Sequence, residues 1–543
     1  MAEGGVGRSS ALLAAGTMVS RVLGFGKAIV LAMAIGQVGS QSANAFTIAN
    51  QLPNNIYALI AGGVLSAVLV PQIVRASKGA DGGNLFVNRI LTLGVTVFVV
   101  AALAATIGAP LLVNLYARAL EGPVYALAVV FAYWCLPQVL FYAVYSLLGE
   151  VLNARKVYGP FTWAPVVNNV VAIGGLVVFM LIYGQTPANN LATGWDAGRI
   201  TLLAGTTTLG VVLQAGFLAF FWRRAGLRFR PDFHWRGVGL GRAGKAAGWM
   251  FAMVVVGQIA AVFQTNAGAV ASAADLPGVA GNATLANSWL VFMLPHSIVA
   301  VSLITVYYTR MSSHVHDGDL ASLRTDVAQS LRNILLVVVF ASVGLMVLAF
   351  PFARFFESRS FDGVEAMARV MLAYLPGLAA FSTLAVMQRV LYAREETRTA
   401  FWLQLVQSAL IVTSALLCSA LLPVENIAVG IAIGTSVAGT TQAVLAVLVV
   451  RKRIGGIDGR KVLARVIVYT LASLVAGGAG LGVLVPLGGF SADGWAQSGI
   501  PQAGLSMLLV GVLMAAVYGV LLLLARDPEV RGLVGVVRRR LGR

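Results

Sequence analysis

The sequence predicts an all-α polytopic membrane protein that crosses the bilayer about 14 times. Hydrophobic residues make up 59% of the 543 residues, charged residues only 11%, and the mean hydropathy is +0.86. A soluble domain carries roughly 25% charged residues. Long apolar runs follow one another along the chain, and cations gather in alternate connections between them. A chain this apolar needs lipid as part of its solvent.

Apolar runs long enough to cross a membrane account for nearly the whole chain, since a spanning helix needs about 20 such residues. Pro53 and Pro295 fall inside two of these runs and predict bends in them. The first run continues past Arg21 and Lys27 and has no short signal-peptide core, so we expect it to be retained as a span. The expected spans are 10–36, 42–74, 85–115, 124–152, 160–184, 198–222, 240–270, 283–310, 325–351, 365–394, 399–422, 425–450, 462–487 and 500–525.

The charges between spans predict the orientation. One set of connections holds few cations, namely Arg118, Arg199, Arg354 and Arg359. Because cytoplasmic loops carry an excess of lysine and arginine, the richer set and both termini are expected in the cytoplasm. The tail 526–543 reads as a basic surface helix. The richer set includes Arg75, Lys78, Arg155, Lys156, Arg223, Arg224, Arg228, Arg230, Arg236, Arg310, Arg324, Arg394, Arg398, Arg451, Lys452, Arg453, Arg460 and Lys461.

Composition and motifs argue against several functions. The net charge of +18 sits in short loops beside apolar runs, which indicates topology and anionic lipid headgroups rather than nucleic acid. Cys135 and Cys418 are isolated in apolar runs, and His314 and His316 lie in a loop, where solvation is the ordinary state. No phosphate-binding loop is present. We therefore expect no cofactor, no metal, no catalytic residue and no enzyme activity.

Charged side chains inside a span are costly and typically face a cavity. Arg21 and Lys27 lie six residues apart in the first span, which is about 240° of net rotation, so a straight helix does not bring them to one face. Gly24 and Gly26 between them allow a bend. We expect both cations to bind an anionic headgroup. The alternatives are that Lys27 snorkels toward the interface and that Arg21 lies near the cytoplasmic end of the span.

Amides inside spans are the second set of candidates. They either face substrate or form interhelical hydrogen bonds. Arg389 in the tenth span either binds substrate or snorkels toward Arg394, and Glu150 is expected to pair at the interface with Arg155 or Lys156. The in-span amides are Asn44, Asn50, Gln51, Asn54, Asn55, Gln258, Gln264, Asn266 and Gln388.

Several of these residues stand in stretches that resemble the MurJ/MviN lipid II flippases, a family within the multidrug/oligosaccharidyl-lipid/polysaccharide exporter superfamily. The resemblance covers most of 10–450 in order and is strongest to actinobacterial members. The matching stretches are SRVLGFGK at 20–27, ANAFTIANQLPN at 43–54, VLSAVLVPQ at 64–72, EVLNARKVYGPFTWAPVVNNV at 150–170, GQIAAVFQTNAGA at 257–269, LPHSIVAVSLITVYYTRMS at 294–312 and LYAREETRTA at 391–400.

This resemblance implies two lobes around a central cavity, alternating access, and a lipid II cargo in a bacterial plasma membrane. Residues 1–222 would form the first lobe, 223–450 the second, and 451–543 two additional spans and the tail. Family cavities use arginines for the pyrophosphate. Arg21 matches one of these, and Lys27 replaces another. The family's basic residues in the second span fall on Tyr57 and Ala58 here, and its arginine in the eighth span falls on Leu290. The family's acidic residues fall on Asn44 and Gly62.

The expected mechanism assigns the pyrophosphate to Arg21 and Lys27. The sugar or peptide is assigned to Asn44, Asn50, Gln258 and Asn266, and Asn54 and Arg389 are further candidate substrate-binding residues. The missing family arginines keep two alternatives open. One is an exporter of another polyprenyl-linked glycan or of an amphipathic drug. The other is a non-transporting scaffold that would have cell-wall synthesis proteins as partners.

Overall fold

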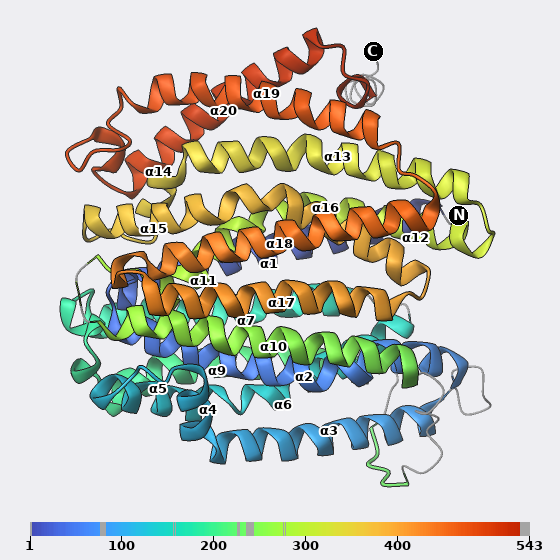
Figure 1. Ribbon diagram of the computed structural model, residues 1–543. Helices are drawn as coiled ribbons and strands as arrows, with labels where there is room; N and C mark the ends of the chain where they lie inside the picture. Colours follow the sequence, from blue (N-terminus) through green and yellow to red (C-terminus); the bar gives the residue numbers. More distant parts are fainter. Residues whose placement is uncertain are drawn as a thin grey trace. The chain divides into compact units, whose positions relative to one another are not determined.

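The computed structural model describes residues 3–76, 83–155, 157, 159–224, 229–234, 244–274, 276 and 278–532, and within them the chain is mainly helical (Figure 1). Side chains are described within these ranges except for 3–14, 61–76, 154, 223 and 244–247. Among the described residues, 13 helical segments are long and apolar enough to cross a membrane. The predicted all-α membrane fold is confirmed.

These 13 segments match all the expected spans except 42–74, and the long helix α2 (Gln41–Ala76) covers that stretch. Pro53 lies inside α2 without ending it. The other spans run through α1 (Glu3–Ile35), α3 (Asn84–Ile107), α4 (Ala109–Tyr116), α5 (Gly122–Cys135), α6 (Gln138–Ala154), α7 (Gly159–Tyr183), α8 (Ala197–Ile200), α9 (Thr206–Arg224), α10 (Gly244–Ala273), α11 (Asn282–Pro295), α12 (Val301–His316), α13 (Leu320–Val347), α14 (Ala349–Arg354), α15 (Phe361–Tyr374), α16 (Leu378–Ala393), α17 (Thr397–Leu421), α18 (Val424–Ile454), α19 (Gly459–Leu484) and α20 (Ile500–Leu524).

Several spans are interrupted, and each interruption has a local cause. Pro137 lacks an N–H and separates α5 from α6. The predicted bend at Pro295 is a π-helical turn, His296–Ala300, between α11 and α12. At this turn, buried His296 places Nδ1 2.9 Å from the Ser382 hydroxyl of α16. Interrupted helices of this kind are usual in transporters, where the irregular backbone lines the substrate cavity.

The chain divides into two compact units. Unit 1 is Met1–Asp275 with Gly281–Ala283, and unit 2 is Leu276–Ala280 with Thr284–Arg543. Helix α10, which covers the seventh expected span, therefore belongs to unit 1. The predicted lobes 1–222, 223–450 and 451–543 stay a prediction.

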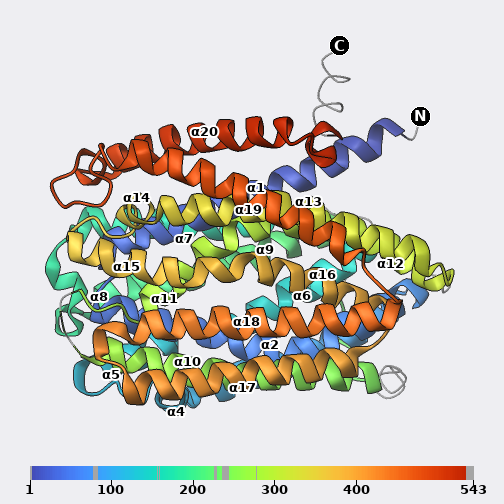
Figure 2. The ribbon, with the colours of Figure 1, turned by 45° about the horizontal axis from the view of Figure 1, so that its top comes forward.

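Small residues bring the helices of unit 1 close together. Gly16, Ser20 and Gly24 repeat every four residues on α1, so they lie along the side that meets α7. A Cβ at Gly16 would stand 3.0 Å from the Trp163 indole nitrogen of α7. The Asn169 side chain of α7 donates a 2.9 Å hydrogen bond to the Ser20 carbonyl oxygen. Helix α7 in turn packs on α9, while α2 packs on α5, α6 and α10 (Figure 2).

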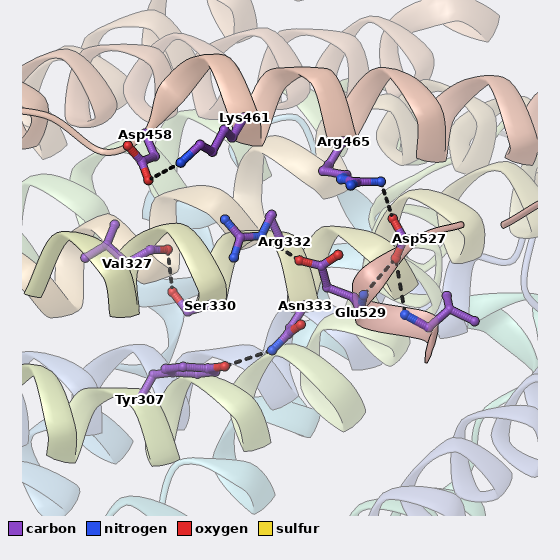
Figure 3. Close-up of polar contacts among 11 residues, drawn as sticks. Tyr307, Val327, Ser330, Arg332, Asn333, Asp458, Lys461, Arg465, Asp527 and Glu529 are labelled. Atoms are coloured by element: carbon purple, nitrogen blue, oxygen red, sulfur yellow. Dashed lines mark hydrogen bonds and ion pairs between the residues drawn. The ribbon is translucent and has the colours of Figure 1, made fainter. Parts of the chain in front are cut away.

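Unit 2 combines packed helices with ion pairs between helices and the segment after α20. Helix α13 packs against α12, α16 and α19, and α19 packs against α20. Arg332 of α13 donates to Glu529 at 2.6 Å, and Arg465 of α19 donates to Asp527 at 3.0 Å (Figure 3). Asp527 also accepts the backbone N–H of Val530. These contacts fix the segment after α20 onto α13 and α19.

Candidate substrate-binding site

The two cations of α1 lie at different depths in the span. Lys27 stands eight residues before the helix end at Ile35, roughly 12 Å along the axis, and Arg21 about 9 Å deeper. Both residues lie in the interior of Ala15–Ile35, one of the 13 segments long and apolar enough to cross a membrane. Because the hydrocarbon core is about 30 Å thick, Lys27 lies near mid-membrane.

Neither cation of α1 is neutralised. Arg21 and Lys27 are half-buried, and neither makes a hydrogen bond or ion pair with any residue that the structure describes. The Nη1 atom of Arg21 is fully buried without a partner. A buried charged donor left unpaired costs more than the roughly 1–3 kcal/mol of a neutral one. A bound anion would offset this cost.

Two predicted amides have unused acceptors at the same two depths. Asn50 lies nine residues into α2, which follows α1 after the short connection 36–40, and this depth matches that of Lys27. Ser272 near the end of α10 accepts the Asn282 N–H, and Asn44 near the start of α2 accepts the adjacent Ala283 N–H, so these two helix ends lie at one level. Gln258 is then about 21 Å from that level along α10, at the depth of Arg21. The side-chain oxygens of Asn50 and Gln258 are buried and unpartnered.

Three other predicted residues already have partners in the structure. Asn44 is buried, and its side-chain oxygen accepts the Ala283 N–H at 2.9 Å at the start of α11. Asn266 accepts the Arg118 N–H at 2.9 Å and donates to the Leu115 carbonyl oxygen at 2.6 Å. These two amides join backbone segments within unit 1. Asn54 is exposed and hydrogen-bonded to Tyr142 of α6.

Arg389 belongs to unit 2 and is exposed. Its guanidinium lies over the Tyr308 ring of α12, 5.2 Å from the ring centroid, which is a cation–π contact. Of the predicted residues, Arg21, Lys27, Asn50 and Gln258 therefore lie in unit 1 with polar atoms that have no partner among the described residues, while Arg389 lies in unit 2 with an aromatic partner.

Sequence reasoning missed some polar contacts and misplaced others. Asp326 is buried, with Arg310 at 2.6 Å and His314 at 3.2 Å, so His314 lies in the last turn of α12 beside a buried carboxylate rather than in a solvated loop. The expected ion pair of Glu150 is absent among the described residues, and Lys156 lies outside them. Within the described chain, no group of three or more His, Cys, Asp or Glu side chains is arranged to hold a metal ion.

The all-helical fold, the interrupted spans and the polar side chains inside them define a multi-pass membrane transporter. The family model of the lipid II flippase MurJ matches residues 32–487, so the chain belongs to that family. The resemblance predicted from the sequence motifs is confirmed.

Relatives and solved structures agree with this assignment. The probable lipid II flippase MurJ of Haemophilus influenzae is 26% identical over 534 residues, which cover 94% of this chain and 98% of that protein. The lipid II flippase MurJ of Burkholderia cenocepacia is 26% identical over 405 residues, 70% of this chain and 72% of that protein.

Two solved structures share the fold. A lipid II flippase MurJ in an inward closed conformation superposes with a TM-score of 0.71 at 18% identity, covering 98% of this chain and all of that one (100%). An inward-facing multidrug transporter of the MATE family has a TM-score of 0.62 at 15% identity and covers 81% of this chain and 96% of its own.

Proposed function

We propose that this chain is a flippase that moves lipid II, the undecaprenyl-pyrophosphate-linked peptidoglycan precursor, from the inner to the outer leaflet by alternating access. Membership of the MurJ family and the names of its relatives support this cargo. The observation that carries the proposal is the pair of unneutralised in-span cations, Arg21 and Lys27. Cations without acidic partners at this depth suit a diphosphate, whose oxygens accept charge-assisted hydrogen bonds.

In this mechanism the unpaired side chains bind different parts of the headgroup. Arg21 presents a fork of donors to phosphate oxygens, and Lys27 supplies a compact charge. Asn50 and Gln258 accept hydrogen bonds from hydroxyl or amide groups. Asn44 and Asn266 keep the backbone of unit 1 in place. The polyprenyl tail stays in the bilayer, where its apolar carbons lose nothing.

The direction of transport follows from the charge of the cargo. With the cytoplasm negative, an anionic headgroup gains about 2.3 kcal/mol per elementary charge per 100 mV when it crosses to the outside. The cation-rich connections support a bacterial plasma membrane location with both termini in the cytoplasm. The cargo and membrane lipids are then the main partners. No enzyme activity and no nucleic-acid partner are proposed, and cell-wall synthesis proteins are partners under the scaffold alternative.

Complementation tests the proposal. A bacterium depleted of its own lipid II flippase would be given the wild-type chain, Arg21→Ala or Lys27→Ala, with membrane levels compared by immunoblot. We expect rescue by the wild type and loss of rescue in both variants.

Each alternative predicts a different pattern. A well-expressed wild type that fails to rescue contradicts a lipid II cargo and favours another polyprenyl-linked glycan, which the absence of cations at Tyr57, Ala58 and Leu290 supports. Rescue by both variants would keep the flippase and reject the cationic site.

A further inference from the structure

Helix α6 carries a polar face inside a span. Gln138, Tyr142, Ser146 and Glu150 repeat every four residues, and the neighbouring positions 139, 143, 147 and 151 are apolar and buried in the core of unit 1. Tyr142, Ser146 and Glu150 are partly exposed. A polar face gains nothing from contact with lipid tails, so it contacts other polar side chains, water or a ligand.

A chain of hydrogen bonds fixes the part of this face near the start of α6, at Gln138 and Tyr142. The Thr208 hydroxyl donates to the Trp134 carbonyl oxygen at 2.7 Å, and buried Gln138 donates to Thr208 at 2.8 Å. The Tyr142 hydroxyl donates to the Gln138 side-chain oxygen at 3.0 Å. Because the single O–H of Tyr142 donates to Gln138, the Tyr142 oxygen acts as the acceptor in its hydrogen bond with the Asn54 amide.

This orientation determines what Asn54 offers. Its NH2 group is directed at Tyr142, so its carbonyl oxygen is left as an acceptor on an exposed side chain. One turn further along, Tyr57 of α2 is hydrogen-bonded to Ser146 and lies near Glu150. The ring centroids of Tyr57 and Tyr142 are 6.1 Å apart. Helices α2 and α6 thus form one aromatic and amide surface with its groups held in place.

The charge of this surface is opposite to that of α1. Glu150 is the only charged residue of α6, and residues 41–60 of α2 have none. Glu150 forms no ion pair within the described parts of the chain. A surface with acceptors, aromatic rings and one carboxylate repels phosphate and favours hydroxyl, amide and ammonium groups.

We propose that this α2–α6 surface is a second headgroup subsite, which binds the uncharged sugar and amide part of the cargo through Asn54 and an ammonium group of its peptide through Glu150. Tyr142 is a positioning residue that orients Asn54. The inference rests on the proposed function and deepens it: α1 binds the anionic part of the headgroup, and the α2–α6 surface distinguishes which headgroup is attached.

The test compares three purified lipids on the full chain in nanodiscs by native mass spectrometry. The lipids are undecaprenyl pyrophosphate, lipid II, and lipid II with its peptide amine acetylated. Asn54→Ala and Tyr142→Phe should lower the affinity for lipid II about 3- to 10-fold and leave undecaprenyl pyrophosphate unchanged. Glu150→Gln should lose about 10-fold for lipid II but nothing for the acetylated lipid.

Matched controls are Tyr133→Phe and Glu121→Gln, two exposed side chains of unit 1 outside this surface. Equal losses for all three lipids in Asn54→Ala, Tyr142→Phe and Glu150→Gln would show a structural role only and overturn the subsite, as would no loss at all. Wild-type protein that binds undecaprenyl pyrophosphate but does not prefer lipid II also overturns it, yet leaves the α1 site standing. Wild-type protein that binds none of the lipids contradicts the proposed function itself.

Discussion

The cations of α1 differ from Arg332 of α13 and Arg465 of α19 in whether they have acidic partners. Arg332 and Arg465 meet carboxylates at 2.6 Å and 3.0 Å, and the Asp527 carboxylate is fully buried. Arg21 and Lys27 have no such partners among the described residues. A cation paired with a buried acid holds helices together, whereas a cation left unpaired inside a span is available to an anionic ligand. Stability and binding should therefore depend on different residues.

The largest expected effect is on stability, at Asp527. In Asp527→Ala, Arg465 loses its carboxylate, and the backbone N–H groups of Glu529 and Val530 lose their acceptor. Removing one partner of a buried pair costs about 3–5 kcal/mol. Denaturant unfolding of the detergent-purified protein should show a loss of this size. The exposed Asp493→Ala is the control, and an equal loss in both would remove the structural role of the pair.

The next effect concerns affinity rather than stability. Arg21→Ala and Lys27→Ala should weaken binding of undecaprenyl pyrophosphate about 10- to 100-fold, since hydrogen bonds to charged groups are worth about 1.5–3 kcal/mol. Their unfolding free energies should stay within about 0.5 kcal/mol of wild type, because no partner is left behind. Native mass spectrometry and unfolding of the same samples check both halves. A loss of stability without a loss of affinity would show that Arg21 and Lys27 stabilise the fold rather than bind the cargo.

A smaller effect should appear with pH at Asp232, in the connection after α9. Backbone and side-chain hydrogen bonds from His234, together with one from Arg89, lower the pKa of Asp232 to about 2. A lowered folded-state pKa stabilises the fold above the ordinary value of 3.8, and this contribution is lost as pH falls toward 2. The unfolding midpoint of Asp232→Asn should therefore fall less than that of wild type between pH 5 and pH 3. Parallel curves for the two proteins would argue against the Arg89 pair.

The smallest effect is expected at an exposed pair. Arg369 and Glu365 stand one turn apart on α15 with side chains 60% and 37% exposed. Exposed pairs at this spacing contribute about 0.3–0.5 kcal/mol, so Glu365→Ala should barely move the unfolding midpoint, and less still at high salt. A loss comparable with that of Asp527→Ala would mean that burial is not what separates the two classes of cation.

Much of the fold was predictable because its signal is local. Each span is a run of apolar residues, and Pro295 marks an interruption because proline lacks a backbone donor. Pro137 also separates two helices but was not among the predicted bends, and Pro53 lies inside the unbroken α2. The pairing of Arg465 with Asp527 was not predictable, because it joins residues 62 positions apart in sequence whose neighbours carry no motif.

The candidate site was predictable in part. An arginine or lysine inside an apolar run is visible in one sequence, so Arg21 and Lys27 were found. An in-span amide, however, does not reveal whether it faces backbone or substrate. Asn44 and Asn50 look alike in sequence, yet one accepts the Ala283 N–H and the other has an unpartnered oxygen. The four-residue repeat of polar side chains on α6 was a readable signal that hydropathy alone conceals.

Transport of lipid II in proteoliposomes tests the central claim most directly. Purified wild type, Arg21→Ala, Lys27→Ala and the control Arg369→Ala would be reconstituted at equal density, and movement of labelled lipid II between leaflets would be timed. The account predicts that both α1 variants slow transport at least about tenfold, in line with the loss of one charged hydrogen bond, while the control keeps the wild-type rate. Wild-type rates in both α1 variants would show that the unpaired cations of this span do not bind the cargo.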